Sequence, residues 1–329
     1  MNILLTGASS GIGYQCAKKL VSEGHKLILP CRDNATSERT KKKLISDVGF
    51  REDNHLTPIF SDTDLSDLNQ INDFTDELLK SKIKIDVLIL NAGLQYVGDK
   101  NPRFSKQGFE LTFAVNHLSH QLITQRLLPL LLSSSSPRVI VTSSEVHNPL
   151  SPGGRIGTPA SLGKICELEN QIKSNLIYGL SDFNADKAYK NSKLCNILFA
   201  KELYRRIAVI REDFAVIAWA PGLVIPKSSQ GFFRYSRQYN QIGQRIFAFI
   251  ARDLLKISET TEHAGHILQE LATSSVYFRS GFSFYSNQLI RPGVLKFSAS
   301  SVSEEAEKVD LARSLWIASE YILSKFNKK

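Results

Sequence analysis

Cysteine is scarce in this 329-residue sequence, and its pattern excludes two classes of protein. Disulfide-stapled domains carry dense cysteines, and zinc sites carry closely spaced ones. Neither applies, because no CxxC pair occurs. We therefore predict no disulfide framework and no metal site, and we expect a reducing, cytoplasmic location. The four cysteines are Cys16, Cys31, Cys166 and Cys195.

Long apolar runs are also missing. No window approaches the roughly 18 consecutive apolar residues of a transmembrane helix. Residues 2–6 already have the pattern of a buried strand, so no signal or transit peptide is expected before them. Apolar residues make up 42% and charged residues 22%, which is typical of a globular protein able to bury a sizeable core.

Acidic residues are outnumbered, and the net charge is +9. Such a balance is found in nucleic-acid-binding proteins, but these cluster their basic residues. Here the basic residues are dispersed, and the runs at 41–43 and 328–329 are short. We therefore predict solvated surfaces and no nucleic-acid partner. A positive surface would favour an anionic cofactor or an anionic membrane instead.

Short β-branched or apolar runs alternate with longer segments of helical periodicity. This alternation predicts parallel strands joined by crossover helices. The expected fold is α/β, a single doubly wound sheet of about seven strands with helices on both faces, in one domain over residues 1–329. The predicted strands are Ile3–Thr6, Leu27–Pro30, Thr57–Phe60, Val87–Leu90, Val139–Thr142, Phe214–Ala220 and Gly281–Tyr285.

Two segments interrupt this rhythm, at residues 145–186 and 223–258. Insertions of this length in a compact domain usually form lids or binding walls. Both follow the end of a predicted strand, where ligands bind in such sheets. We interpret both as substrate-binding elements. The second is rich in aromatic and basic residues, so peripheral membrane contact is an alternative for it.

A glycine-rich loop follows the first strand and opens a helix. Its spacing is TGxxxGxG, in which glycines permit a tight turn and let backbone amides approach a pyrophosphate at the helix N-terminus. A plain strand–helix turn is the alternative, but the strand–loop–helix context favours dinucleotide binding. The predicted cofactor-binding residues of this loop are Gly7, Ser9, Ser10, Gly11, Ile12 and Gly13.

The end of the second strand indicates which dinucleotide is bound. An acid there would bind the ribose 2′-hydroxyl of NAD, whereas an arginine suits the 2′-phosphate of NADP. Arg32 follows this strand, so we predict NADPH as the cofactor. The alternative is that Arg32 is a surface residue and Asp33 binds the ribose. Asp64-Leu65 and Asn91-Ala92-Gly93 follow the third and fourth strands and are further candidates, although turn chemistry explains each equally well.

Tyr189 and Lys193 are four residues apart and so share one helical face. A phenol is a poor proton donor at neutral pH, and a nearby ammonium lowers its pKa by favouring the phenolate. Ser144, after Ser143 at the end of the fifth strand, could bond a substrate oxygen. Asn116 could hold a water beside the lysine. Each has a structural alternative, but together, behind a dinucleotide loop, they predict an oxidoreductase.

In this order the motifs resemble those of the short-chain dehydrogenases/reductases over nearly the whole chain. The resemblance implies a Rossmann-type fold and a catalytic tetrad of Asn116, Ser144, Tyr189 and Lys193. Tyr189 and Lys193 are then also cofactor-binding residues. The resemblance further implies that Pro221-Gly222 contacts the cofactor. Dimers and tetramers are common in the family, so a homo-oligomer is one expectation.

Within the family, the 45 residues from Ser144 to Tyr189 resemble the long link of the light-dependent protochlorophyllide oxidoreductases. The stretch from Lys187 to Asn196 and the last helix are also similar to that branch. Three features depart from it: Ser143-Ser144-Glu145, the Leu223 that replaces a cysteine, and Pro226 near an expected threonine. Cys195 matches a cysteine of that branch, but six residues past Tyr189 we interpret it as structural.

Three functions therefore remain open from the sequence. The first is NADPH-dependent reduction of a bulky, apolar, conjugated substrate, similar to protochlorophyllide reduction. The second is reduction of carbonyls or oxidation of alcohols, as in the retinol-dehydrogenase-type branch, which the Ser-Ser pair and residues 115–118 resemble. The third is a non-catalytic dinucleotide-binding interaction protein, which does not need a paired tyrosine and lysine.

Overall fold

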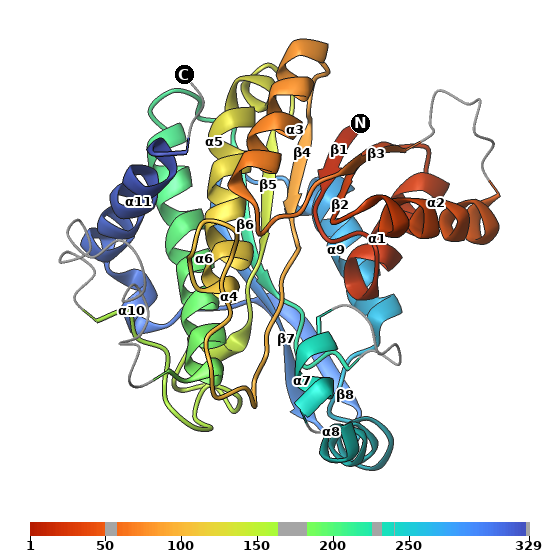
Figure 1. Cartoon of the computed structure of the whole chain (residues 1–329), viewed down its shortest axis with the longest axis vertical. Coiled ribbons are helices and arrows are strands. Elements are labelled where there is room, and N and C mark those ends of the chain that lie inside the picture. The colour runs from red at the N-terminus through yellow and green to blue at the C-terminus, as the bar shows by residue number, and fades with distance from the viewer. Residues whose placement is uncertain (50–57, 164–182, 226–231, 240, 327–329) are drawn as a thin grey trace.

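A computed structural model of the chain describes residues 1–49, 58–163, 183–225, 232–239 and 241–326. The strands in this part form one eight-stranded sheet of order β3-β2-β1-β4-β5-β6-β7-β8 (Figure 1). All neighbouring pairs are parallel except β7 and β8. The strands are β1 (Asn2–Leu5), β2 (Lys26–Cys31), β3 (Ile59–Asp62), β4 (Val87–Leu90), β5 (Arg138–Thr142), β6 (Ala215–Ala220), β7 (Gly281–Arg291) and β8 (Val294–Ala299).

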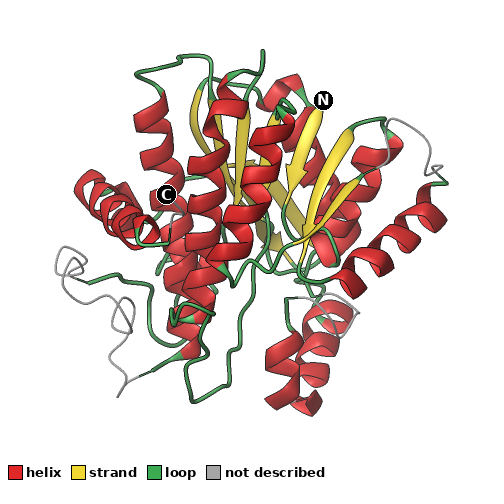
Figure 2. Ribbon diagram, turned by 45° about the horizontal axis from the view of Figure 1, so that its top comes forward, coloured by secondary structure: helices red, strands yellow, loops and turns green. Residues whose placement is uncertain are grey.

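Helices connect successive parallel strands and are placed on both faces of the sheet (Figure 2). The α-helices are α1 (Gly11–Ser22), α2 (Asn34–Val48), α3 (Leu68–Ser81), α4 (Leu111–Phe113), α5 (Ser119–Leu132), α6 (Ala185–Ile207), α7 (Arg234–Tyr239), α8 (Gln241–Ala248), α9 (Thr261–Thr273), α10 (Glu304–Glu307) and α11 (Val309–Ser324). Two π-helices, η1 (Ala114–Leu118) and η5 (Phe249–Leu254), and two 3₁₀ turns, η2 (Glu145–His147) and η6 (Ser275–Tyr277), complete the described elements.

The hydrophobic core has two layers because alternate side chains of a strand point to opposite faces. In β1, Ile3 and Leu5 face the layer made with α1, α2 and α9. Leu4 faces the other layer, which includes α3, α5 and α6, with α11 packed against α6. The predicted doubly wound α/β sheet with helices on both faces is thus confirmed.

Two strand predictions were wrong by more than one residue at an end. The third strand begins at Ile59 rather than Thr57; Pro58 has no N–H for the strand ladder, and residue 57 lies outside the described part. The seventh strand continues to Arg291 and turns through Pro292-Gly293 into β8, an eighth strand that the sequence analysis missed. Gly293 has φ +78°, and a Pro-Gly pair between apolar runs was the available signal.

The strand order places a binding crevice at one edge of the sheet. β1 lies between β2 and β4. The strands that follow β1 in sequence, β2 and β3, lie on one side of it, and the later strands, from β4 on, lie on the other side. Ligands bind in such sheets at the carboxyl edge, where the strand order reverses. This edge carries the loops that follow β1, β4, β5 and β6, which contain most of the predicted site residues.

Candidate active site

The glycine-rich loop after β1 is packed closely against the loop after β4. Gly7 has φ +73°, and a Cβ there would lie 2.8 Å from the Cα of Ala92. A Cβ on Gly13 would lie 2.3 Å from the carbonyl oxygen of Gly7 and 2.6 Å from Nδ2 of Asn91. Only glycine fits at these two positions, so two of the predicted cofactor-loop residues hold the loop's shape.

The other loop residues line the exposed side of this turn. Ser9, Ser10, Gly11 and Ile12 are all partly exposed. Gly11 has φ +56°, and a Cβ there would meet nothing within 4 Å. Ser10 is the N-cap residue of α1, but its side chain makes no capping hydrogen bond. The first amides of a helix have no partner within the helix, so the start of α1 suits an anionic phosphate group.

Thr6, which was not among the predicted site residues, joins the two loops. Its Oγ1 accepts hydrogen bonds from the amides of Asn91 and Ala92, each at 3.0 Å. Nδ2 of Asn91 donates to the carbonyl of Thr6 (3.2 Å), and Nε2 of His120 lies 3.1 Å from Oγ1 of Thr6. The threonine of the TGxxxGxG pattern was the signal for this role, whereas nothing near His120 in sequence pointed to it.

Arg32 and Asp33 follow β2 and interact with each other. Asp33 is the N-cap residue of α2: its Oδ1 accepts from the amide of Thr36 (2.7 Å), and its Oδ2 accepts from Nε of Arg32 (3.0 Å). The hydrogen bonds from Thr36, with a smaller effect of Arg32, lower the pKa of Asp33 to about 2. Both carboxylate oxygens already have partners, while the Arg32 side chain is 46% exposed at the strand tip.

Asp64 and Leu65 have structural contacts in the described structure. Oδ1 of Asp64 accepts from the amide of Ser66 (2.9 Å), and the amide of Asp64 donates to the Gln70 side chain. Leu65 packs against the core.

Gly93, by contrast, lies next to two of the predicted site residues. A Cβ at this position would be 3.4 Å from Oδ1 of Asn116 and 3.6 Å from Nζ of Lys193.

Tyr189 and Lys193 lie one turn apart on α6, as their spacing predicts. The helix begins after Asn184, whose side chain accepts from the amide of Lys187. Nζ of Lys193 is 5.7 Å from the centroid of the Tyr189 ring and donates to the carbonyl of Thr142 at 3.1 Å. Burial lowers the pKa of Lys193 to about 7.

The two serines after β5 have different partners. Oγ of Ser143 donates to the backbone carbonyl of Lys193 (2.8 Å), so this hydroxyl holds β5 against α6. Ser144 instead lies close enough to the Tyr189 hydroxyl to influence its pKa. Burial raises the pKa of Tyr189, and the neighbouring Ser144 hydroxyl acts in the opposite direction. Ser144, rather than Ser143, is therefore the serine that lies beside Tyr189.

Asn116 lies in the π-helix η1, a type of element often found at functional sites. Its Oδ1 accepts from the amide of Leu94 (2.9 Å), and its Nδ2 donates to the carbonyl of Leu94 and to Oγ of Ser192, each at 3.0 Å. The side chain thus connects the loop after β4 to α6. Of the predicted proton relay, the structure shows only this placement beside Lys193.

Pro221 and Gly222 lie at the same edge, after β6. Gly222 has φ +81°, and a Cβ there would be 2.8 Å from the carbonyl oxygen of Asn287. Nδ2 of Asn287 donates to the carbonyl of Pro221 (3.4 Å) and to Oε2 of Glu259 (2.8 Å). Glu259 was not predicted; its amide donates to the carbonyl of Leu223, which closes the base of the 223–258 segment.

Aromatic side chains from this segment reach α6. The Phe232 ring meets the Tyr189 ring edge-on at 5.4 Å, and Phe233 lies against Phe232. In α7, Oγ of Ser236 donates to the Gln95 side chain at 2.8 Å. The described part of the segment thus contacts the predicted site. Of the 145–186 segment, residues 164–182, including Cys166, lie outside the described residues, as does Pro226.

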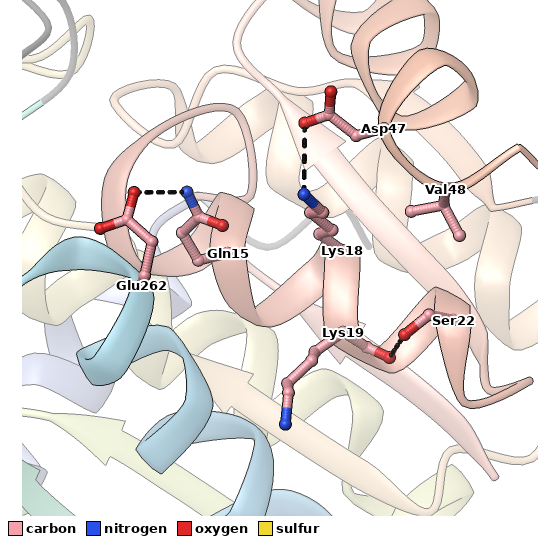
Figure 3. A pocket seen from close by; sticks show the side chains of 7 residues that line it. All are labelled: Gln15, Lys18, Lys19, Ser22, Asp47, Val48 and Glu262. Carbon is pink, nitrogen blue, oxygen red and sulfur yellow. Dashed lines mark hydrogen bonds and ion pairs between the residues drawn. The ribbon is translucent and has the colours of Figure 1, made fainter.

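Other candidate features of the described residues do not join this site. A hollow of about 350 Å³ lies on the outer side of α1, lined by residues of α1, α2 and α9 (Figure 3). Cys16, Cys31 and Cys195 are free and buried. Within the described ranges, no group of three metal-ligating side chains is present, and no helix is both long and apolar enough to cross a bilayer.

The fold and this arrangement define a dinucleotide-binding α/β oxidoreductase scaffold, and comparison with known proteins gives its class. Residues 1–154 match the family of short chain dehydrogenases. The chain belongs to the short-chain dehydrogenase/reductase family.

Its similar relatives include protochlorophyllide reductases of plants. The protein from Cucumis sativus is 30% identical over 98% of this chain and 77% of its own length. Protochlorophyllide reductase A from Arabidopsis thaliana is 29% identical, with coverages of 98% and 76%. A solved structure of L-sorbose reductase from Gluconobacter frateurii with NADPH and L-sorbose has a TM-score of 0.62 at 15% identity, covering 90% of this chain and 96% of that one. It supports the fold alone.

Proposed function

We propose that the protein is an NADPH-dependent reductase of a bulky, apolar, conjugated substrate, similar to protochlorophyllide reductase. The observation that carries this proposal is the placement of Tyr189 and Lys193 one turn apart on α6, with Lys193 beside Gly93 and Ser144 close to the Tyr189 hydroxyl, at the edge where the glycine-rich loop begins α1. The similarity to protochlorophyllide reductases over 98% of this chain supports the substrate class.

NADPH would supply a hydride to one carbon of the substrate double bond. Tyr189 would donate the proton that the neighbouring carbon needs, and the Lys193 ammonium would stabilise the resulting phenolate. The start of α1 would hold the pyrophosphate, and Arg32 the 2′-phosphate. Through its three side-chain hydrogen bonds, Asn116 would hold the backbone of Leu94 next to Ser192, so that the loop after β4 stays in place beside Lys193.

A second candidate is a retinol-dehydrogenase-like carbonyl reductase. The closeness of the Ser144 and Tyr189 hydroxyls favours it, because two adjacent hydroxyl groups can both donate to one carbonyl oxygen. A non-catalytic dinucleotide-binding protein is the third candidate. It is disfavoured because burying the Lys193 side chain costs free energy, and a buried charged group of this kind is typical of a functional site.

One experiment separates the three candidates. The purified protein is mixed with NADPH and protochlorophyllide and monitored by absorbance, first in darkness and then under illumination. The proposed function predicts a red-shifted product band only after illumination. Oxidation of NADPH in darkness with retinal would instead establish the carbonyl reductase, and no turnover with either substrate would leave the binding protein.

Ser144→Ala tests whether the reduced bond is C=C or C=O. If the bond is C=C, no oxyanion forms, and we expect kcat with protochlorophyllide to fall by less than about tenfold, through the pKa of Tyr189 alone. A carbonyl substrate would lose about 10²–10³-fold. Ser143→Ala is the matched control, since its hydroxyl serves only α6. A hundredfold loss confined to Ser144→Ala would contradict C=C reduction.

Arg32→Ala tests the choice of cofactor. We expect the Kd for NADPH, measured by nucleotide fluorescence, to rise about 10–100-fold, because a charge-assisted hydrogen bond to the 2′-phosphate is lost. The Kd for NADH should not change. Arg39→Ala, at an exposed position in the same α2 region, serves as the control. Equal losses for NADPH and NADH would contradict the NADP assignment.

Burial of Lys193 predicts a pH dependence of stability. Its pKa is about 7 in the folded chain and about 10.4 when unfolded. Between these values the unfolded chain binds a proton that the folded chain does not, so stability rises with pH, by at most about 1.4 kcal/mol per unit. Burial also raises the pKa values of Tyr14 and Tyr96, but this affects the stability of the folded chain only above about pH 10.

The measurement is the free energy of unfolding without nucleotide at pH 7 and pH 9, for the wild type and for Lys193→Met. The wild type should gain stability relative to the variant over this interval. Parallel curves for the two proteins would show that Lys193 keeps its proton in the folded chain.

A further inference from the structure

A buried histidine of α5 contacts the cofactor loops, although the proposed reaction does not use it. His120 is 1% exposed, and its Nε2 lies 3.1 Å from Oγ1 of Thr6, at the start of the glycine-rich loop. A neutral imidazole has one nitrogen that donates and one that accepts, and its hydrogen-bond partners decide which is which. The contact with Thr6 therefore fixes the state of the His120 ring.

The Thr6 hydroxyl already has two donors. The amides of Asn91 and Ala92 both donate to Oγ1, each at 3.0 Å. A hydroxyl has two lone pairs and one hydrogen, so these amides use both lone pairs. The hydrogen then has two acceptors within reach, Nε2 of His120 at 3.1 Å and the carbonyl of Ile89 at 3.3 Å. An Nε2–H group would be a third donor with no lone pair to meet. Nε2 is therefore the acceptor, and the ring carries its hydrogen on Nδ1.

The surroundings of His120 also favour the neutral ring. Burial lowers the pKa of His120 to about 3, and Lys193 and His117 act in the same direction. The backbone carbonyl of Asn116 acts in the opposite direction, so it lies close enough to the ring to influence this pKa. At neutral pH the ring is therefore uncharged, and Nε2 is able to accept a hydrogen bond.

His120 and Asn116 hold the loop after β4 at two neighbouring points. His120 acts through the threonine hydroxyl on the two amides that precede Gly93. Asn116 binds both the amide and the carbonyl of Leu94, the residue that follows Gly93. Gly93, which lies beside Lys193, is thus held from both sides by residues four apart on one helical stretch, η1 followed by α5.

We propose that His120 is a positioning residue of the NADPH site. With its hydrogen on Nδ1, the ring accepts the hydrogen of the Thr6 hydroxyl, which turns both lone pairs of Oγ1 toward the loop after β4. This keeps the loop after β4 against the glycine-rich loop in the shape that binds the dinucleotide. The inference rests on the proposed function, and it adds a residue that acts through Thr6 rather than by touching the cofactor.

Substitutions of His120 test this through the Kd for NADPH, measured on the full chain by nucleotide fluorescence. His120→Phe keeps an aromatic ring but removes the acceptor. We expect the Kd to rise at least about fivefold, because the Thr6 hydroxyl loses its buried partner and no longer holds the two loops together. His120→Gln should bring the Kd back to within about twofold of wild type, since its side-chain oxygen can accept at the position of Nε2. A loss of packing alone would not be repaired by this smaller, non-aromatic side chain.

His117→Phe is the matched control. His117 is likewise buried, but its Nε2 lies 2.9 Å from Oγ of Ser319 in α11, away from both cofactor loops. This variant loses one hydrogen bond in the same way, and its Kd for NADPH should stay within about twofold of wild type. Equal rises of the Kd in the two phenylalanine variants would overturn the inference. An unchanged Kd in His120→Phe would overturn this inference alone, whereas a wild type that does not bind NADPH would remove the proposed function with it.

An NMR spectrum that correlates the imidazole nitrogens with their hydrogens tests the state of the ring in the wild type. The signals of His120 are assigned by their absence from the spectrum of His120→Gln. We expect a hydrogen on Nδ1 and none on Nε2, both without nucleotide and with NADP⁺ bound. A hydrogen on Nε2 would overturn the inference, and this result does not depend on whether His120→Phe folds.

Discussion

Tyr189→Phe should abolish turnover while leaving NADPH binding intact. We expect kcat to fall by about 10²–10⁴-fold, because the variant lacks the hydroxyl that donates the proton. The Kd for NADPH should change little, since the tyrosine ring and its contact with Phe232 are kept. Steady-state kinetics and nucleotide titration, run on the same preparation, measure the two quantities separately.

Tyr204→Phe is the control for this prediction. Tyr204 lies on the same helix, partly buried against the core and remote from Ser144, so losing its hydroxyl should leave kcat within about twofold. If Tyr189→Phe keeps full activity, proton donation by the phenol is ruled out for both reductase candidates. Loss of activity in both variants would indicate damage to α6 instead.

Gly13→Ala should remove cofactor binding. Its Cβ would overlap the carbonyl oxygen of Gly7 and the Asn91 side chain, at 2.3 and 2.6 Å, and both belong to the packed loops beneath the proposed pyrophosphate site. We expect overpacking to cost about 1–3 kcal/mol of unfolding free energy. The Kd for NADPH should rise at least about tenfold, because the loop amides would be displaced.

Gly153→Ala is the matched control for the glycine substitution. A Cβ there would meet only the end of the Val146 side chain, at 3.1 Å, which can move aside. Denaturant unfolding and nucleotide titration measure both variants. Unchanged NADPH affinity in Gly13→Ala, despite a loss of stability, would show that the nucleotide does not bind over this loop.

The sequence predicted the features that depend on local pattern. Strand and helix periodicity gave the sheet with helices on both faces, and the four-residue spacing placed Tyr189 and Lys193 on one side of α6. The choice of Ser144 over Ser143 came from the family resemblance, and the structure places Ser144 beside Tyr189. Each of these features depends on a few residues that are close together in the sequence.

Features that depend on contacts between distant segments could not be predicted in this way. Glu259 becomes important only because the fold brings it to Asn287, and His120 only because it lies at Thr6, 114 residues earlier. Phe232 likewise becomes part of the site only because the fold brings its ring to Tyr189, 43 residues earlier in the sequence. β8 was missed for a different reason. The Pro-Gly pair before it was present in the sequence, but β7 was predicted to end at Tyr285 instead of Arg291.

The central claim is that Tyr189 and Lys193 lie over the reactive carbon of a bound dinucleotide. A crystal structure of the protein with NADP⁺ tests it most directly. We predict the pyrophosphate on the amides at the start of α1, Nζ of Lys193 within hydrogen-bonding distance of the nicotinamide ribose, and the Tyr189 hydroxyl beside the nicotinamide C4. A nucleotide bound elsewhere, or a nicotinamide ring turned away from Tyr189, would contradict the account.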